Sequence, residues 1–204
     1  MTLDLCYQEF LDNLLAEKNV SYSTITSYTT DFKILWSFLI QNKIEPILEN
    51  INTPLLRKYI SYLKVDMKYQ TNTIRRKIHS LSSFYKFLSE HEYIEKNPML
   101  HIHTPKEEYK IPIYLTEYNL KILLKAPKKY TRFQNHVLRD KTIIKILIFT
   151  GARRSEILAL NWENIDFGKQ IITIRKGKGN KERIIPLHEN LSCDLWNTFK
   201  LDYH

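Results

Sequence analysis

The sequence lacks the features that mark membrane proteins and disulfide-stabilised secreted domains. Its two cysteines, Cys6 and Cys193, lie far apart, so a disulfide has no support and a reducing cytoplasm is the simpler expectation. The longest apolar run, residues 143–149, is interrupted by Lys145 and is too short to span a bilayer. Residues 1–4 lack the basic start and apolar stretch of a secretory signal. We therefore expect a cytoplasmic protein without membrane attachment.

What the chain does have is an uneven distribution of positive charge. Hydrophobic residues make up 43% of the sequence, which is enough to build a core, and the formal net charge is +9. Residues 1–100 contain 12 basic and 11 acidic residues, a net of +1, whereas residues 101–204 contain 19 and 11, a net of +8. A basic half favours a polyanion such as nucleic acid, through phosphate neutralisation and counterion release. Many globular domains are basic without such a partner, so the charge alone is weak evidence.

Apolar residues recur at helical spacing over residues 1–100 and predict four helices. The second is expected to begin after an N-cap at Ser23, the third at Thr53-Pro54, and the fourth to run from Thr73 to Glu90. The apolar stripe of this fourth helix contains Ile74, Ile78, Leu81, Tyr85 and Leu88. Such helices joined by short loops predict a small all-α bundle.

Residues 101–113 show no periodicity and are predicted to link the bundle to a second domain, residues 114–204. In that domain we expect an apolar helix over residues 139–149, buried on several sides. The other expected elements are helices beginning at Thr116, after an N-cap at Ser155 and near Asn190, and strands over residues 170–175 and 183–187. The strands flank Gly177-Lys178-Gly179-Asn180, which is typical of a hairpin turn. The fold class is therefore predicted to be α+β.

Two segments of the second domain are more specific. Residues 150–162 read TGARRSEILALNW, and residues 177–187 read GKGNKERIIPL. In this order they resemble the first half of the catalytic domain of tyrosine recombinases, the phage integrase family, and especially its Xer-type members. Residues 23–28 and 73–88 are similar to the family's helical core-binding domain. The resemblance implies a SAM-like DNA-binding bundle followed by a partial mixed catalytic domain with a small antiparallel sheet.

The first motif fits a phosphate clamp. Gly151 permits a tight turn at the end of a helix, and Arg153 then projects beside the start of the next helix. A guanidinium binds two phosphate oxygens at once, and its charge stabilises the additional negative charge that develops as the phosphorane forms. The resemblance implies that Arg153 is catalytic. Glu156, three residues further on, is in a position to orient the arginine or to support the turn. The alternative is an ordinary helix start, with exposed arginines and a structural glutamate.

The second motif places Lys178 at a hairpin tip, from which an ammonium group could protonate a departing sugar oxygen. The resemblance implies that Lys178 is the general acid. Lys181 and Arg183 are expected to contact DNA phosphates or solvent. The alternative is a basic β-turn that is merely solvated. The segment lacks the spacing and the Ser or Thr of a Walker nucleotide-binding loop, and no cofactor is expected.

A third candidate surface lies on the fourth helix. If Ile74 is at the centre of the apolar stripe, the side chains that point outward are Arg75, Arg76, His79, Ser83 and Lys86. We expect Arg75, Arg76, His79 and Lys86 to contact duplex DNA, in the major groove or along a phosphate backbone. An ordinary solvated face is the competing interpretation, and the family resemblance favours DNA.

The resemblance also implies residues that this sequence does not supply in the right place. The family's His-x-x-Arg motif and tyrosine nucleophile should follow Lys178, after which only 26 residues remain. Tyr203 falls where the family has an early helix, and His136-Val137-Leu138-Arg139 precedes Arg153, so both are rejected. His101 and His103 have no nearby Cys or acid pair, so no metal site is expected. We expect the chain to be catalytically incomplete, with apolar surface left uncovered.

The leading hypothesis is site-specific DNA recombination or integration by a recombinase-like chain that binds double-stranded DNA. The alternative is a non-catalytic DNA-binding regulator of a full-length recombinase, and a third interpretation is a helical adaptor without a nucleic-acid role. The expected partners are duplex DNA and a full-length recombinase or a second copy of the chain. Salt-dependent binding to duplex DNA would separate the first two hypotheses from the third.

Overall fold

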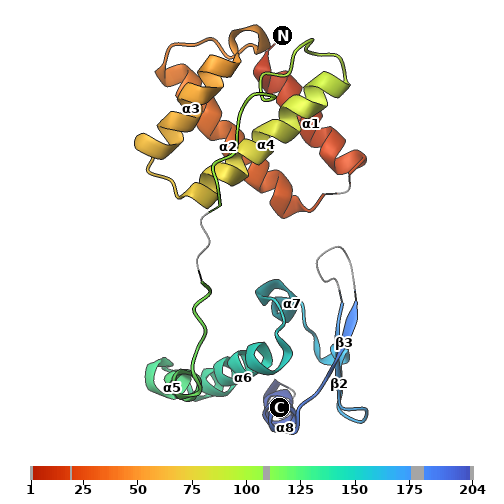
Figure 1. Cartoon of the computed structure of the whole chain (residues 1–204). Coiled ribbons are helices and arrows are strands. Elements are labelled where there is room, and N and C mark those ends of the chain that lie inside the picture. Colours follow the sequence, from red (N-terminus) through yellow and green to blue (C-terminus); the bar gives the residue numbers. More distant parts are fainter. Residues whose placement is uncertain (1, 19, 108–110, 176–181, 203–204) are drawn as a thin grey trace. The chain divides into compact units, whose positions relative to one another are not determined.

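The computed structural model describes residues 2–18, 20–107, 111–175 and 182–202. Its internal contacts divide the chain into two compact units, residues 1–111 and 112–204 (Figure 1). None of the helices in the described ranges combines the length and apolarity that crossing a bilayer would require.

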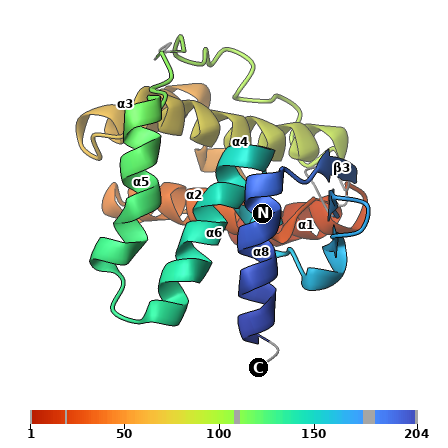
Figure 2. The same ribbon diagram turned by 90° about the horizontal axis from the view of Figure 1, so that it is seen from below.

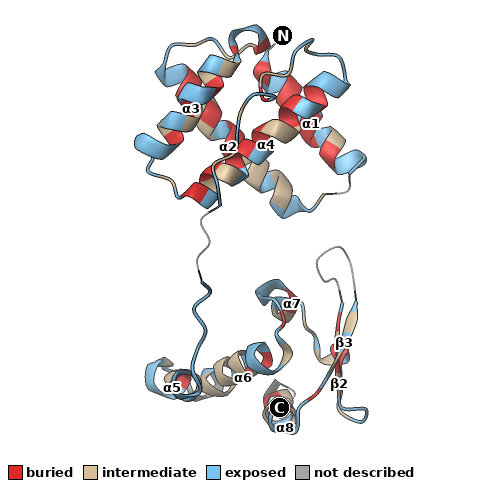
Figure 3. Ribbon diagram, viewed as in Figure 1, coloured by how far each residue is buried: buried red, intermediate tan, exposed pale blue. Residues whose placement is uncertain are grey.

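Unit 1 is a bundle of four helices, as predicted. They are α1 (Leu3–Ala16), α2 (Tyr22–Gln41), α3 (Thr53–Val65) and α4 (Thr71–Glu90), with a short 3-10 turn, η1 (Leu48–Asn50), before α3. Helix α4 packs against the other three and buries the predicted stripe from Ile74 to Leu88 (Figures 1 and 3). The centre of the bundle is aromatic: the rings of Tyr7 and Phe32 stack at 3.8 Å, and Phe84 meets Tyr7 edge-on at 5.1 Å.

Unit 2 combines helices with a small antiparallel sheet, which confirms the predicted α+β class. Its elements are α5 (Glu117–Tyr130), α6 (Gln134–Thr150), α7 (Arg154–Leu158), η2 (Trp162–Asn164), β1 (Ile165–Asp166), β2 (Ile171–Ile174), β3 (Arg183–Pro186) and α8 (Glu189–Asp202). The strand order is β1-β2-β3, and Ile172 lies opposite both Ile165 and Ile185. Strand β1 was not predicted, because two residues are too few to show an alternating pattern. Helix α6 contacts α5 and α8, which flank it in Figure 2.

The core of unit 2 is small, and one prediction about it was wrong. Its buried centre includes Ile172, Leu191 and Leu195. The apolar helix α6 was expected to be buried on several sides, but Leu147 is 41% exposed and Ile143 is 38% exposed. Within the described residues, α5 and α8 cover only part of its surface, so an apolar sequence did not ensure burial (Figure 3).

Three predicted N-caps are displaced by one or two residues. The hydroxyl of Ser21, not Ser23, accepts the N–H of Thr24, and Asn52, not Thr53, caps α3 by accepting the N–H of Leu55. The residue at the N-cap of α7 is Arg153, not Ser155. At α2 and α3 the capping oxygen lies three residues before the residue whose N–H it accepts, and neighbouring polar residues make this register hard to read from sequence.

Candidate active site

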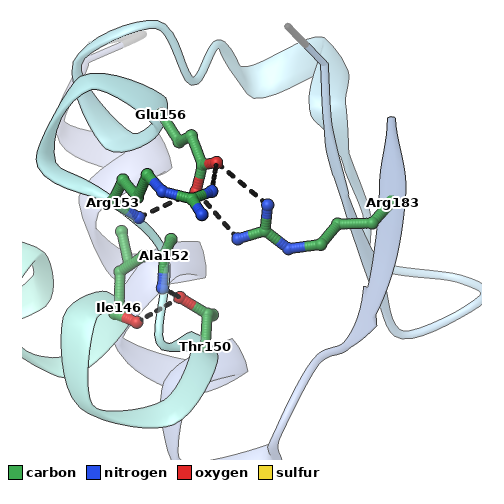
Figure 4. Close-up of polar contacts among 6 residues, drawn as sticks. All are labelled: Ile146, Thr150, Ala152, Arg153, Glu156 and Arg183. Atoms are coloured by element: carbon green, nitrogen blue, oxygen red, sulfur yellow. Dashed lines mark hydrogen bonds and ion pairs between the residues drawn. The ribbon is translucent and has the colours of Figure 1, made fainter. Parts of the chain in front are cut away.

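The candidate site begins with the turn that ends α6. Gly151 has a φ of +58°, a left-handed conformation that closes the helix, and its N–H donates to the carbonyl of Leu147 at 3.1 Å. Thr150 Oγ1 donates to the carbonyl of Ile146 at 2.6 Å and accepts the N–H of Ala152 at 3.1 Å (Figure 4). An added Cβ at Gly151 would meet nothing within 4 Å, so glycine is favoured here by its backbone conformation and not by lack of space.

Glu156 fixes the residue that follows this turn. Its side chain is only 2% exposed, and its Oε2 accepts the backbone N–H of Arg153 at 2.8 Å. Its Oε1 accepts Nη1 of the same arginine at 2.9 Å, while the Arg153 side chain is 58% exposed. The Arg153 side chain is therefore attached to the protein through one terminal nitrogen and remains more than half exposed.

A second arginine reaches the same carboxylate from the sheet. Arg183, the first residue of β3, donates Nη1 to Oε1 of Glu156 at 2.9 Å and Nη2 to Oε2 at 2.8 Å. Figure 4 shows its side chain extending from the strand towards Glu156. Hydrogen bonds from Arg183, and then from the backbone of Arg153, lower the pKa of Glu156 to about 2. The same pairing raises the pKa of Arg183. Glu156 thus joins α7 to β3.

The contact between Arg183 and Glu156 was not predicted. Arg183 was expected to contact DNA phosphates or solvent, whereas in the structure both terminal nitrogens of its guanidinium donate to Glu156. Lys178 and Lys181 lie outside the described residues, as does Tyr203. Strands β2 and β3 are paired up to the ends of the segment that carries the two lysines, where Ile174 lies opposite Arg183.

The outward face of α4 in unit 1 differs in detail from its prediction. His79 and Lys86 are exposed as expected, and Lys86 makes an exposed ion pair with Glu90 at 3.5 Å. The two arginines have partners within unit 1. Arg75 donates to the carbonyl of Pro105 and lies 3.8 Å from Glu107. The other, Arg76, donates hydrogen bonds to the carboxylate of a buried aspartate.

That acid, Asp31 on α2, is only 2% exposed and was missed by the sequence analysis. It accepts both terminal nitrogens of Arg76 at 2.8 Å and Nζ of the buried Lys77 at 2.7 Å. A signal was present, because Asp31 falls on the apolar stripe of α2, three residues after Tyr28 and four before Leu35. An acid in such a stripe needs a buried cationic partner, which Lys77 supplies.

The other features considered in the sequence lie outside the clusters around Glu156 and Asp31. Arg139 of the rejected His-x-x-Arg sequence donates to its neighbour Asp140 at 2.8 and 3.0 Å, which lowers the pKa of that carboxyl. Among the described residues, no group of three or more His, Cys, Asp or Glu side chains could hold a metal ion. A groove of about 610 Å³, lined by residues that include Ile143, Leu147 and Leu158, follows the exposed side of α6.

Comparisons with known proteins identify the family. The profile of the phage integrase N-terminal SAM-like domain matches residues 7–92, and that of the phage integrase family matches residues 114–198. Tyrosine recombinase XerD of Staphylococcus epidermidis is 33% identical over 184 residues, 90% of this chain and 60% of that protein. Tyrosine recombinase XerC of Pediococcus pentosaceus is 34% identical over 201 residues, 95% of this chain and 65% of that protein. The chain therefore spans 60–65% of the length of these relatives.

Solved structures show the same fold. A lambda integrase tetramer bound to a Holliday junction matches with a TM-score of 0.73 at 16% identity, over 94% of this chain and 53% of that one. XerH recombinase bound to a palindromic difH substrate matches with a TM-score of 0.68 at 22% identity, over 90% and 54%. The two family profiles and the two relatives show that the chain belongs to the phage integrase family of tyrosine recombinases.

Proposed function

We propose that this chain binds duplex DNA and serves in site-specific recombination, with Arg153 as a clamp on the phosphate at the site of strand exchange. The observation that carries the proposal is the arginine itself, which is attached to a buried carboxylate at one end and is 58% exposed. A guanidinium held in this way is oriented before the phosphate arrives, so binding costs less side-chain entropy. The relatives, named as tyrosine recombinases, supply the reaction class.

Lys178 is the proposed general acid. An ammonium near the scissile phosphate would protonate the sugar oxygen that leaves when the backbone is cut. Lys181 is proposed to contact a neighbouring phosphate. In unit 1, the proposed DNA contacts are His79 and Lys86, together with Arg76, whose side chain is 47% exposed although it is bonded to Asp31.

The polypeptide of residues 1–204 is proposed to bind DNA without cutting it. No His-x-x-Arg sequence follows Lys178 in this polypeptide, so a second arginine is not supplied to the phosphate. Incubation with a nicked recombination site, followed by denaturing electrophoresis, should give no covalent protein–DNA adduct. An adduct formed by this polypeptide alone would show that this part of the proposal is wrong.

Binding is tested by fluorescence anisotropy with labelled duplex DNA over a series of salt concentrations. The logarithm of the affinity should fall linearly with the logarithm of salt, with a slope of about −0.9 for each phosphate neutralised. Arg153→Gln should reduce the magnitude of that slope by about 0.9. Arg132→Gln removes the same charge from an exposed position in the loop between α5 and α6 and should change the slope less. Equal effects of the two substitutions would refute a specific role for Arg153.

A further inference from the structure

Arg153 and Arg183 both bind the carboxylate of Glu156. Glu156 has two oxygens, and each accepts hydrogen bonds from both arginines. Arg183 uses two terminal nitrogens in a forked pairing, whereas Arg153 uses one terminal nitrogen and its backbone N–H. The forked pairing is the stronger arrangement for a guanidinium and a carboxylate. Glu156 is therefore paired mainly with Arg183.

The pairing of Glu156 with Arg183 affects the net charge that Arg153 and its neighbours present to a phosphate. Arg153, Glu156 and Arg183 together carry a net charge of +1 when all are ionised, and the low pKa of Glu156 keeps its carboxylate charged at neutral pH. Without Arg183, the carboxylate would face Arg153 alone and the pair would have no net charge. A phosphate approaching Arg153 would then meet a neutral pair in place of a site with a net positive charge.

We propose that Arg183 is a positioning residue, which neutralises Glu156 so that the guanidinium of Arg153 keeps its charge for a phosphate. Arg183 acts through Glu156 and does not contact DNA. Glu156 in turn has two tasks: it accepts the backbone N–H of Arg153 and it ties α7 to β3. This inference rests on the proposed function, because it concerns the anion that Arg153 would bind.

A pair of substitutions separates this role from a direct contact with DNA. Arg183→Gln leaves Glu156 facing Arg153 alone, so duplex affinity should fall about tenfold and the salt slope should weaken by about 0.9. In the double variant Arg183→Gln/Glu156→Gln, the site has a net charge of +1 again, and the amide oxygen can still accept the N–H of Arg153. Affinity and slope should then return to near the parent values. If Arg183 contacts a phosphate directly, the second substitution will not restore either value, and the inference is wrong.

Glu156→Gln alone provides a second test. It removes the negative charge but keeps both arginines, so the folded variant should bind duplex DNA more tightly than the parent chain and with a steeper salt slope. Weaker binding by a folded variant would overturn the proposal, because it would mean that the negative charge of Glu156 assists phosphate binding and does not oppose it. Circular dichroism and thermal melting establish folding for every variant.

The same experiments distinguish failure of the proposed function from failure of this inference. If the parent chain shows no salt-dependent binding, or if Arg153→Gln does not change the slope, the phosphate role of Arg153 is refuted. If Arg153→Gln weakens the slope but Arg183→Gln has no effect, only the role of Arg183 is refuted. Arg132→Gln serves as the charge-matched control throughout, since Arg132 is exposed.

Discussion

Substitution of Asp31 by asparagine tests the buried ion pair between α2 and α4 in unit 1. The carboxylate of Asp31 lies 2.7 Å from Nζ of Lys77, and the two side chains are 2% and 3% exposed. Asparagine has nearly the same shape but no charge, so the substitution leaves the ammonium of Lys77 buried without its counterion. Removing one partner of a buried ion pair costs about 3–5 kcal/mol. The ring of Tyr69, 5.0 Å from the ammonium, offsets a small part of this cost.

We therefore expect Asp31→Asn to lower the free energy of unfolding of unit 1 by about 3 kcal/mol. For a unit of this size, such a loss corresponds to a fall in Tm of roughly 10–20 °C. The measurement is urea unfolding monitored by hydrogen-exchange mass spectrometry. Peptides from α2 and α4 report on unit 1 separately from unit 2. Lys86→Met is the matched control on α4, because it breaks only an exposed ion pair and should cost less than about 1 kcal/mol.

The double variant Asp31→Asn/Lys77→Met completes the test. It removes both buried charges, so it should be more stable than Asp31→Asn alone even though it carries an additional substitution. A loss below about 1 kcal/mol for Asp31→Asn would refute the electrostatic argument. A double variant no more stable than the single one would also refute it, because the penalty would then not come from the stranded ammonium.

Three further predictions concern unit 2. Gly151→Ala should destabilise this unit by about 1–2 kcal/mol in urea unfolding, because the φ of +58° strains an L-residue although space for its Cβ is present; an unchanged midpoint would contradict this. Because the pKa of Glu156 is lowered to about 2, its stabilising contribution is fully present above the ordinary carboxyl pKa and is lost as the pH falls from about 4.5 to about 2. The urea midpoint of unit 2 should fall across that range, and the fall should be smaller in Glu156→Gln. Leu147→Gln/Leu158→Ser, which makes the groove along α6 more polar, should reduce binding of the dye ANS; unchanged fluorescence would show that the groove is not an accessible apolar surface.

The helical bundle and the hairpin strands were predictable because their signals are local. The stripe of α4, from Ile74 to Leu88, repeats at helical spacing, and the runs 170–175 and 183–187 are rich in β-branched residues and flank a Gly-Lys-Gly-Asn sequence. The glycine turn before Arg153 was predictable for the same reason. Local signals were weaker at the helix starts, where Ser21 and Ser23 or Asn52 and Thr53 compete as caps. They also did not show that α6 would remain partly exposed, since burial depends on which elements pack against a helix.

Residue order and composition determined the family, the all-α and α+β halves, the excess of positive charge in the second half, and the choice of Arg153. Only the tertiary structure decided how charges pair between elements. It brought Arg183 to Glu156 across 27 positions of sequence, and Lys77 to Asp31 across 46. An arginine on a strand has the same sequence signature whether it faces solvent, a phosphate or a buried carboxylate. The pairing depends on where folding places the opposite charge, because electrostatic energy depends on distance and burial.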